Sequence, residues 1–230
     1  MLKKTFVTFL TVLITFVLLS SGICADIPDD VIFEMYFDAQ KENEATFSDL
    51  DSVPWAVTPI TELSKRGIVA GMGNGIFAPQ SSVSRTEFIK LITATCGLVN
   101  PDAQGSYPDV TKDHWSYAYV CSAKSIGLTD IYPETGLAPN EPISREDICY
   151  ISAKAINICV GTPPDKVQLS NAFSDEAEMS SYAVAPVYQL TKLGIINGRG
   201  DGTFSPKAPA TRAESAKIIY NVLKIIEENY

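Results

Sequence analysis

The hydrophobic positions of the chain recur in three copies of one pattern, and each copy predicts two amphipathic helices joined by a loop. Apolar residues share one face of the first helix, and they are Ile60 and Leu63 in the first copy and Val187 and Leu190 in the third. The second helix has a wider apolar face, made of Phe88, Leu91, Ile92 and Thr95 in the first copy and Ile218, Ile219, Val222 and Leu223 in the third. Two helices cannot bury such faces alone, so the copies must pack together. The pattern predicts a mostly α-helical fold of three helix-loop-helix repeats, at residues 47–98, 107–160 and 173–226.

Fixed spacings between marker residues support the repeat. An aromatic residue precedes a glycine by twelve positions, in the pairs Trp55 and Gly67, Trp115 and Gly127, and Tyr182 and Gly194. A proline precedes an arginine by six positions, in the pairs Pro79 and Arg85, Pro139 and Arg145, and Pro206 and Arg212. We expect the first helix of each copy to start near the aromatic residue and to end at the glycine, a residue type that commonly follows the last helical turn.

The second helix of each copy follows a hydroxyl residue that has an acid three positions later. This arrangement matches or approximates a capping box, in which the hydroxyl accepts from the third helical amide and the acid accepts from the amide of the capping residue. The pairs are Ser84 and Glu87, Ser144 and Asp147, and Thr211 and Glu214. Capping accounts for these residues, so we predict a structural role for them.

An arginine occupies the first helical position after each cap, at Arg85, Arg145 and Arg212. A cation there costs about 0.3 kcal/mol or more, because it lies beside the positive end of the helix dipole. Its recurrence in three copies indicates another use. One interpretation is an ion pair with a carboxylate of a neighbouring copy. The other is capture of a carboxylate or phosphate ligand by the arginine together with free amides of the helix start.

Two further sets of candidate binding residues lie near the start of the first helix. They are Trp55, Trp115 and Tyr182, and Asp49, Asp109 and Asp175. The rings either fill the core, which periodicity favours, or offer a flat platform to a sugar. The aspartates either close a turn, which their position favours, or accept hydrogen bonds from sugar hydroxyls.

Glycines open the loops between the helices in the first and third copies, at Gly71 and Gly198. Their simplest role is to permit turns with positive φ. A phosphate-binding loop does not fit, because no helix starting with Lys-Ser or Lys-Thr follows.

The first 25 residues have the features of a secretory signal peptide. Lys3 and Lys4 precede an apolar run over residues 6–19, and small residues lead to cleavage after Ala25. A retained membrane anchor would need a longer apolar segment. A lipoprotein anchored at Cys24 would have a smaller residue before it than isoleucine. Residues 26–46 form an acidic N-terminal segment.

Charge restricts the partners of the secreted chain. Without the signal peptide it carries 16 basic and 27 acidic side chains, a net charge of −11. This charge argues against nucleic acid and against an anionic membrane surface. An anionic ligand would have to be held by local groups against the overall field.

The sequence gives little support for catalysis or metal binding. His114 is the only histidine, so a histidine-ligated metal cluster is excluded and a catalytic triad would depend on one residue with no nucleophile motif. The cysteines after the signal peptide are Cys96, Cys121, Cys149 and Cys159. They form no C-x-x-C pair and lie in apolar stretches, so we expect buried thiols, although export permits disulfides. We expect no enzyme, no metal and no cofactor.

Together these motifs resemble the S-layer homology (SLH) domain family. In the first copy the matching residues are Phe47, Asp49, Trp55, Ala56, Gly67, Ile68, Gly71, Phe77, Pro79, Ser84, Arg85 and Glu87. The resemblance covers about residues 47–226 and implies a pseudo-threefold bundle with grooves between the copies. It also implies a location at the cell wall or cell surface and non-covalent binding of a secondary cell-wall polymer, a polysaccharide that is often pyruvylated. The groove residues that it implies are Asp49, Trp55, Gly71, Arg85, Asp109, Trp115, Arg145, Asp175, Gly198 and Arg212.

Two departures from the family pattern predict unequal grooves. Ile131 takes the place of Gly71 and Gly198 in the second copy, where a β-branched side chain would obstruct a sugar. Tyr182 replaces tryptophan in the third copy, with one extra residue after Asp175. We expect grooves that use residues of the first copy to bind best. The alternative function is a structural surface-layer or adapter protein that binds other proteins without recognising sugar.

Overall fold

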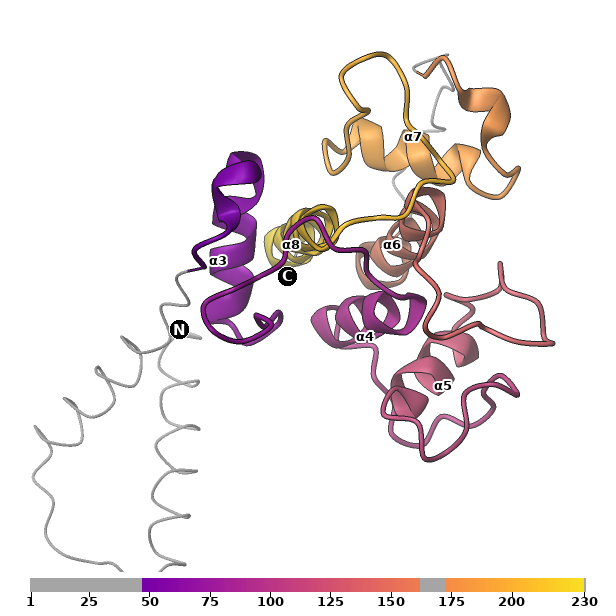
Figure 1. Cartoon of the computed structure of the whole chain (residues 1–230). Coiled ribbons are helices and arrows are strands. Elements are labelled where there is room, and N and C mark those ends of the chain that lie inside the picture. The colour runs from indigo at the N-terminus through magenta and orange to yellow at the C-terminus, as the bar shows by residue number, and fades with distance from the viewer. Residues whose placement is uncertain (1–46, 162–172, 230) are drawn as a thin grey trace, which may run out of the picture. The chain divides into compact units, whose positions relative to one another are not determined.

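The computed structural model describes residues 47–161 and 173–229, all of which belong to one unit of the chain (Figure 1). This part consists of six α-helices and three short 3-10 helices, and the described residues contain no strand beyond isolated bridges. The predicted mostly α fold class is therefore confirmed. The predicted signal peptide, residues 1–25, and the acidic segment, residues 26–46, lie outside the described residues.

Each copy contributes a short helix followed by a longer one. The short helices are α3 (Val57–Lys65), α5 (Tyr117–Ser125) and α7 (Val184–Lys192). The longer helices are α4 (Arg85–Thr95), α6 (Arg145–Val160) and α8 (Arg212–Asn229). The 3-10 helices are η1 (Leu50–Ser52), η2 (Pro54–Ala56) and η3 (Glu176–Glu178). Every short helix starts two residues after the marker aromatic, and every longer helix starts at the marker arginine, as the repeat predicts.

The helix ends confirm two of the local predictions. Gly67, Gly127 and Gly194 follow the short helices with φ of 68°, 75° and 68°, a conformation that glycine adopts without strain. A complete capping box precedes α4, since the Glu87 amide donates to Ser84 Oγ (3.3 Å) and the Ser84 amide donates to Glu87 Oε2 (2.7 Å). Thr211 and Glu214 make the same pair of bonds before α8.

The helices pack in a cyclic pattern between copies. Helices α4, α6 and α8 all contact one another, and each short helix lies against the longer helix of a different copy (Figure 1). Helix α5 packs on α4, α7 on α6, and α3 on α8, so the first copy closes onto the last. Side chains from the three longer helices fill the shared core, among them Phe88, Ile92, Ile148, Ile151, Ile219 and Val222.

A ring of backbone hydrogen bonds joins the copies where the longer helices begin. The Val83 amide donates to the Ala210 carbonyl (3.1 Å), the Ala210 amide to the Ile143 carbonyl (2.9 Å), and the Ile143 amide to the Val83 carbonyl (2.9 Å). Each copy thus donates one hydrogen bond of the ring and accepts one. This ring fixes the three helix starts relative to one another, and with them the arginines that open the helices.

Candidate functional site

The three arginines at the helix starts reach into the loop of the next copy around the ring. Their side chains donate to backbone carbonyls there, Arg85 Nη1 to Leu137 (2.7 Å), Arg145 Nε to Phe204 (2.9 Å) and Arg212 Nε to Phe77 (2.8 Å). Each guanidinium also lies 4.5–4.8 Å from the centre of an aromatic ring, which is Tyr132, Phe204 and Phe77 respectively. Joining the copies is therefore one physical reason for a cation at this position.

The helix-start amides, by contrast, are already occupied. The amides of Arg85, Arg145 and Arg212 donate to carbonyls of Glu141, Ala208 and Ser81 in the next copy. The amides one residue later, in Thr86, Glu146 and Ala213, donate to carbonyls of Pro139, Pro206 and Pro79. The hypothesis of an anion pocket built from free amides is therefore wrong, because contacts between the copies use those amides. A ligand has to be held by side chains.

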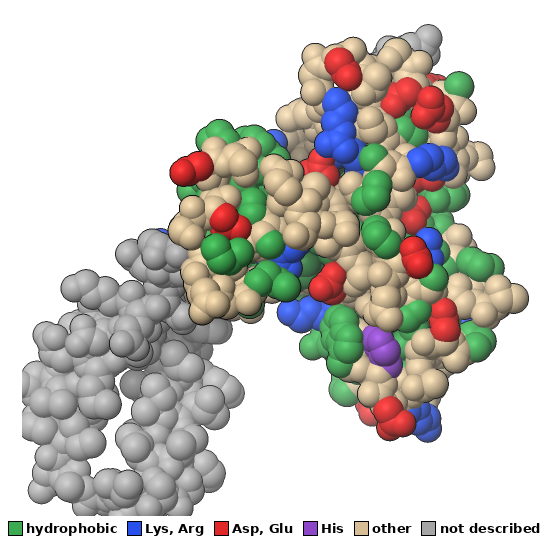
Figure 2. Space-filling model, in the orientation of Figure 1, with side chains coloured by type: hydrophobic (Ala, Val, Ile, Leu, Met, Phe, Trp, Pro, Cys, Tyr) green, Lys and Arg blue, Asp and Glu red, His purple; other side chains and the backbone are tan. Residues whose placement is uncertain are grey.

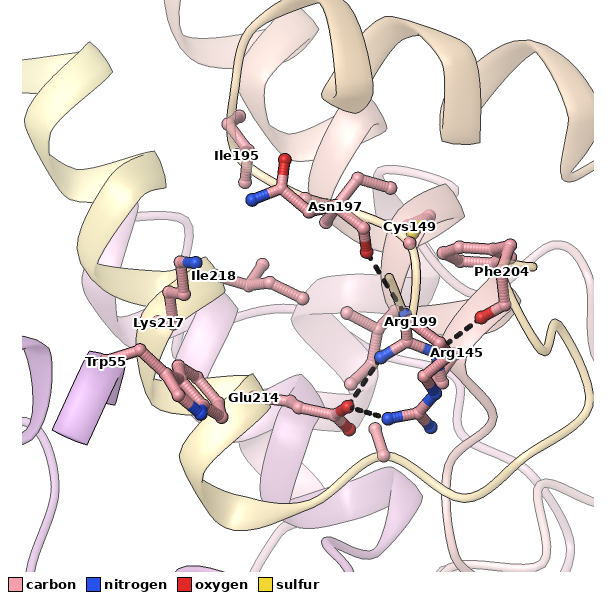
Figure 3. A pocket seen from close by; sticks show the side chains of 14 residues that line it. Trp55, Arg145, Cys149, Ile195, Asn197, Arg199, Phe204, Glu214, Lys217 and Ile218 are labelled. Atoms are coloured by element: carbon pink, nitrogen blue, oxygen red, sulfur yellow. Dashed lines mark hydrogen bonds and ion pairs between the residues drawn. The ribbon is translucent and has the colours of Figure 1, made fainter. Parts of the chain in front are cut away.

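One groove, called groove A here, brings together residues of all three copies. It has a volume of about 320 Å³. Its lining includes Trp55 from the first copy, Arg145 from the second, and Asn197, Gly198, Arg199, Phe204, Glu214 and Lys217 from the third. Trp55 and Lys217 lie on one side of the groove, and Arg145 and Phe204 lie on the other (Figure 3). Trp55 is 46% exposed, so the predicted preference for core filling is wrong for this ring.

A second groove, groove B, has the same construction shifted by one copy. It has a volume of about 310 Å³. Its lining includes Trp115 from the second copy, Arg212 from the third, and Gly71, Met72, Phe77, Glu87 and Lys90 from the first. Trp115 is 57% exposed. Met72 stands where groove A has Arg199, so groove B carries one cation fewer.

Groove A concentrates positive charge in a protein that is negative overall. It contains three cations, Arg145, Arg199 and Lys217, and the carboxylate of Glu214. Glu214 Oε1 accepts from Arg145 Nη1 and from Arg199 Nη1, each at 2.6 Å, which matches the predicted ion pair between copies for one of the three arginines. Burial lowers the pKa of the Arg145 guanidinium and Glu214 opposes that shift, yet arginine remains charged near neutral pH. On the face drawn in Figure 2, lysine and arginine side chains (blue) form several separate small groups among the acidic side chains (red).

The third equivalent position is filled by the protein's own side chains. Tyr132 and Tyr182 donate hydrogen bonds to the two oxygens of Asp147, at 3.1 Å and 2.7 Å. Asp147 replaces the glutamate of the other copies, and its carboxylate serves the tyrosines while its amide still binds Ser144 Oγ (3.1 Å). Burial and the Asp147 charge raise the pKa of both phenols, which therefore stay protonated as donors at neutral pH. Arg85 faces this position.

The obstruction in the second copy arises one residue later than the sequence suggested. Ile131, which we expected to block a sugar, packs against the core. Tyr132, 7% exposed, occupies the space beside Arg85. Its hydroxyl and the aspartate at 147 were both visible in the sequence, but nothing there showed that they meet.

The three aspartates expected in the grooves support turns instead. Asp49 accepts from the amides of Phe77 (2.9 Å) and Ala78 (2.7 Å), and Asp109 and Asp175 bind the equivalent amides of their own copies at the same distances. The second residue of each turn, Ala78, Ala138 or Ser205, has φ between 53° and 59°. Both carboxylate oxygens are engaged in holding this left-handed residue. We therefore assign these aspartates to the structural residues rather than to a ligand site.

We expect Asp49 and Asp109 to make folding sensitive to acid, because the pKa of each carboxyl lies below its ordinary value. Burial raises the pKa of Asp49, but the amides of Phe77 and Ala78 outweigh burial and leave it below its ordinary value. A depressed pKa adds stability above the unfolded value of about 3.9 and loses it as the pH falls through the folded value. Asp49→Asn should lower the midpoint of thermal unfolding at pH 7 by about 2–6 °C and flatten its decline below pH 4. Exposed Asp51→Asn is the control, and equal effects of the two would contradict the assignment.

Gly71 and Gly198 line grooves B and A for a reason other than the positive φ that we expected. Neither glycine is among those with positive φ. A Cβ on Gly71 would lie 2.6 Å from Phe47 Cε1 and 2.8 Å from the Ile76 carbonyl, and one on Gly198 would lie 2.6 Å from the Thr203 carbonyl. Glycine is required because the loop turns back closely on itself and on the first aromatic ring of the copy.

The sequence analysis missed the lysines of the grooves. Lys90 and Lys217 each follow a marker arginine by five positions, so their recurrence was a readable pattern. Lys217 Nζ lies 5.4 Å from the centre of the Trp55 ring. In the second copy the same position is Tyr150, whose ring packs edge-on against Tyr182 at 5.6 Å in the filled position. The lysine therefore accompanies the two open grooves.

Two further features concern only the part of the chain that the structure describes. It contains no cluster of three or more histidine, cysteine or acidic side chains that could hold a metal ion. None of its helices has the length and apolar character needed to cross a membrane. Cys121 and Cys149 are buried, as predicted, whereas Cys96 and Cys159 are partly exposed.

Comparison with known proteins agrees with the repeat. A sequence model of the S-layer homology domain matches residues 46–89, 106–149 and 172–216, together more than half of the chain. The amylopullulanase of Thermoanaerobacterium thermosulfurigenes is 31% identical over 80% of this chain and 10% of its own length. The S-layer proteins sap and EA1 of Bacillus anthracis are 26% and 28% identical, each over 76% of this chain and about a fifth of their own length. The chain thus spans only a small part of these relatives.

Proposed function

The chain belongs to the S-layer homology domain family, and from this membership we propose that it holds to the bacterial cell wall by binding an anionic, pyruvylated secondary cell-wall polysaccharide in grooves A and B. The S-layer homology domain is a non-catalytic anchoring domain, and the family and the S-layer relatives indicate a cell-surface or cell-wall location. The enzymes among the relatives match only over a small part of their length.

The observation that carries the proposal is the pairing of an exposed tryptophan with an arginine in each open groove, an arginine that is buried in groove A and partly buried in groove B. Trp55 and Arg145 line groove A, and Trp115 and Arg212 line groove B. Large apolar rings are costly to expose unless they have a use. A ring face suits the apolar face of a sugar, and a guanidinium suits a carboxylate.

A pyruvyl ketal satisfies both requirements in one residue of a polymer. It fixes a carboxylate to a sugar ring at short range, so the ring can stack on tryptophan while the carboxylate meets the arginine on the opposite side of the groove. The local cations attract this anion although the whole chain is negative. Under this proposal the ligand-binding residues are Trp55, Arg145 and Gly198 in groove A and Trp115, Arg212 and Gly71 in groove B.

The direct test compares binding of the full chain to wall polymer before and after chemical removal of pyruvate. We expect at least a tenfold loss of affinity on removal, because each arginine loses the charge that it pairs with. Equal binding to both polymers would overturn pyruvate recognition. Retention on walls from which the whole polymer has been stripped would favour the alternative, a surface-layer or adapter protein held by other proteins.

A further inference from the structure

Two cysteines of different copies meet at the far end of the longer helices. Cys96 directly follows the last residue of α4 in the first copy, and Cys159 is the last but one residue of α6 in the second. Cys159 Sγ donates to the carbonyl oxygen of Cys96 at 3.7 Å, and burial together with the neighbouring Cys159 side chain raises the pKa of the Cys96 thiol. Both side chains are partly exposed, unlike the buried Cys121 and Cys149.

The repeat gives no packing reason for cysteine at these two places. The positions equivalent to Cys96 are Ile156 and Leu223, and those equivalent to Cys159 are Val99 and Ile226. The other copies thus have larger apolar residues at the equivalent positions of the repeat, although Val99 lies beyond the end of α4. Cysteine replaces them only where the first copy meets the second, which indicates a use that depends on the pair.

We propose that Cys96 and Cys159 form a disulfide that ties the first copy to the second once the protein reaches the cell surface. Surface and secreted proteins meet oxidising conditions in which disulfides persist. The bond would join α4 and α6 at the ends opposite the ring of backbone hydrogen bonds. The two helices would then be fixed at both ends.

Thiol–disulfide exchange with a small disulfide, such as oxidised glutathione, supplies the chemistry. One thiolate attacks a sulfur of the small disulfide, which forms a mixed disulfide and releases one glutathione thiolate. The second cysteine loses its proton to water and attacks the protein-bound sulfur, which releases the second glutathione. The cysteine pair loses two electrons and two protons, and one small disulfide becomes two thiols. Burial raises the pKa of both thiols, so we expect the exchange to be slow at neutral pH.

The test treats the folded full chain with oxidised glutathione and maps its tryptic peptides without reduction. Trypsin cleaves after Lys112, Lys124 and Arg145, which lie between the two cysteines. Cys96 and Cys159 therefore fall in different peptides, which a disulfide would join. We expect one cross-linked peptide pair and a rise of about 5–10 °C in the midpoint of thermal unfolding, reversed by reductant.

Variants separate this pair from the other thiols. Cys159→Ser, or Cys96→Ala if the first does not fold, should abolish both the cross-link and the temperature shift. Cys121→Ala should keep both, since that thiol is buried elsewhere. Glutathione that remains attached to either cysteine, a cross-link that forms only after denaturation, or a cross-link without a rise in the midpoint would each overturn the proposal.

Discussion

The double substitution Trp55→Ala and Trp115→Ala should lower the affinity for pyruvylated wall polymer by about two orders of magnitude. Truncation of a stacked aromatic residue at the centre of an interface typically costs 2 kcal/mol or more, and each 1.4 kcal/mol is a factor of about ten. Trp55 lines groove A and Trp115 lines groove B, so the double substitution impairs both grooves. Titration of the full chain with soluble polymer measures the effect.

The fold should survive this double substitution, because about half of each tryptophan side chain already faces solvent. Circular dichroism and thermal unfolding check that the variant is folded. Tyr182→Phe is the matched control, since it changes the equivalent ring in the filled position and removes the bonds of its hydroxyl to Asp147 and Glu146. Affinity of the double variant within about twofold of the original would show that the rings do not touch the polymer.

Replacing Arg145 and replacing Arg85 should have different effects on binding. Arg145 lines groove A, whereas Arg85 faces the position that Tyr132 and Tyr182 fill. With a short pyruvylated oligosaccharide, titration calorimetry should give two sites for the original chain, one for Arg145→Met and two for Arg85→Met. Each variant loses a bond to a backbone carbonyl and a contact with a ring, which should cost about 1–3 kcal/mol of stability. Arg145→Met also loses the ion pair with Glu214, so we expect it to be the less stable of the two.

Thermal unfolding of both variants therefore has to show that each is folded before its binding sites are counted. Methionine keeps much of the aliphatic length of arginine and removes only its charge and donors. Equal loss of sites in the two variants would contradict the assignment of grooves A and B. Loss of a site in Arg85→Met alone would place the working groove at the position that the tyrosines fill.

Local features of this fold were predictable from the sequence because local interactions determine them. The helix boundaries follow from Ser84, Arg85 and Gly67 and their counterparts, whose capping and left-handed conformations depend on a few neighbouring residues. The apolar faces of α4 and α8 follow from spacing in the same way. Even the half-complete cap at Ser144 could be anticipated, since aspartate is shorter than glutamate.

The composition of the grooves was not predictable, because it depends on which copy packs on which. Sequence analysis placed Trp55, Gly71 and Arg85 together as residues of the first copy. The structure distributes them over groove A, groove B and the filled position. A repeat pattern identifies equivalent residues, but it does not show which copy packs against which, and therefore which residues of different copies line the same groove. The same limit hid the meeting of Tyr132, Tyr182 and Asp147.

The closure of the first copy onto the last has a consequence for how this protein reaches its native state. Helix α3 rests on α8, and the Arg212 amide binds the Ser81 carbonyl, so residues more than a hundred positions apart depend on each other. Such distant pairings form late and slow the search for the folded state. While the chain is being synthesised, helix α3 therefore stays without its packing partner until α8 has been made. Deleting one copy would therefore leave each of the other two copies without one of the neighbours on which it packs.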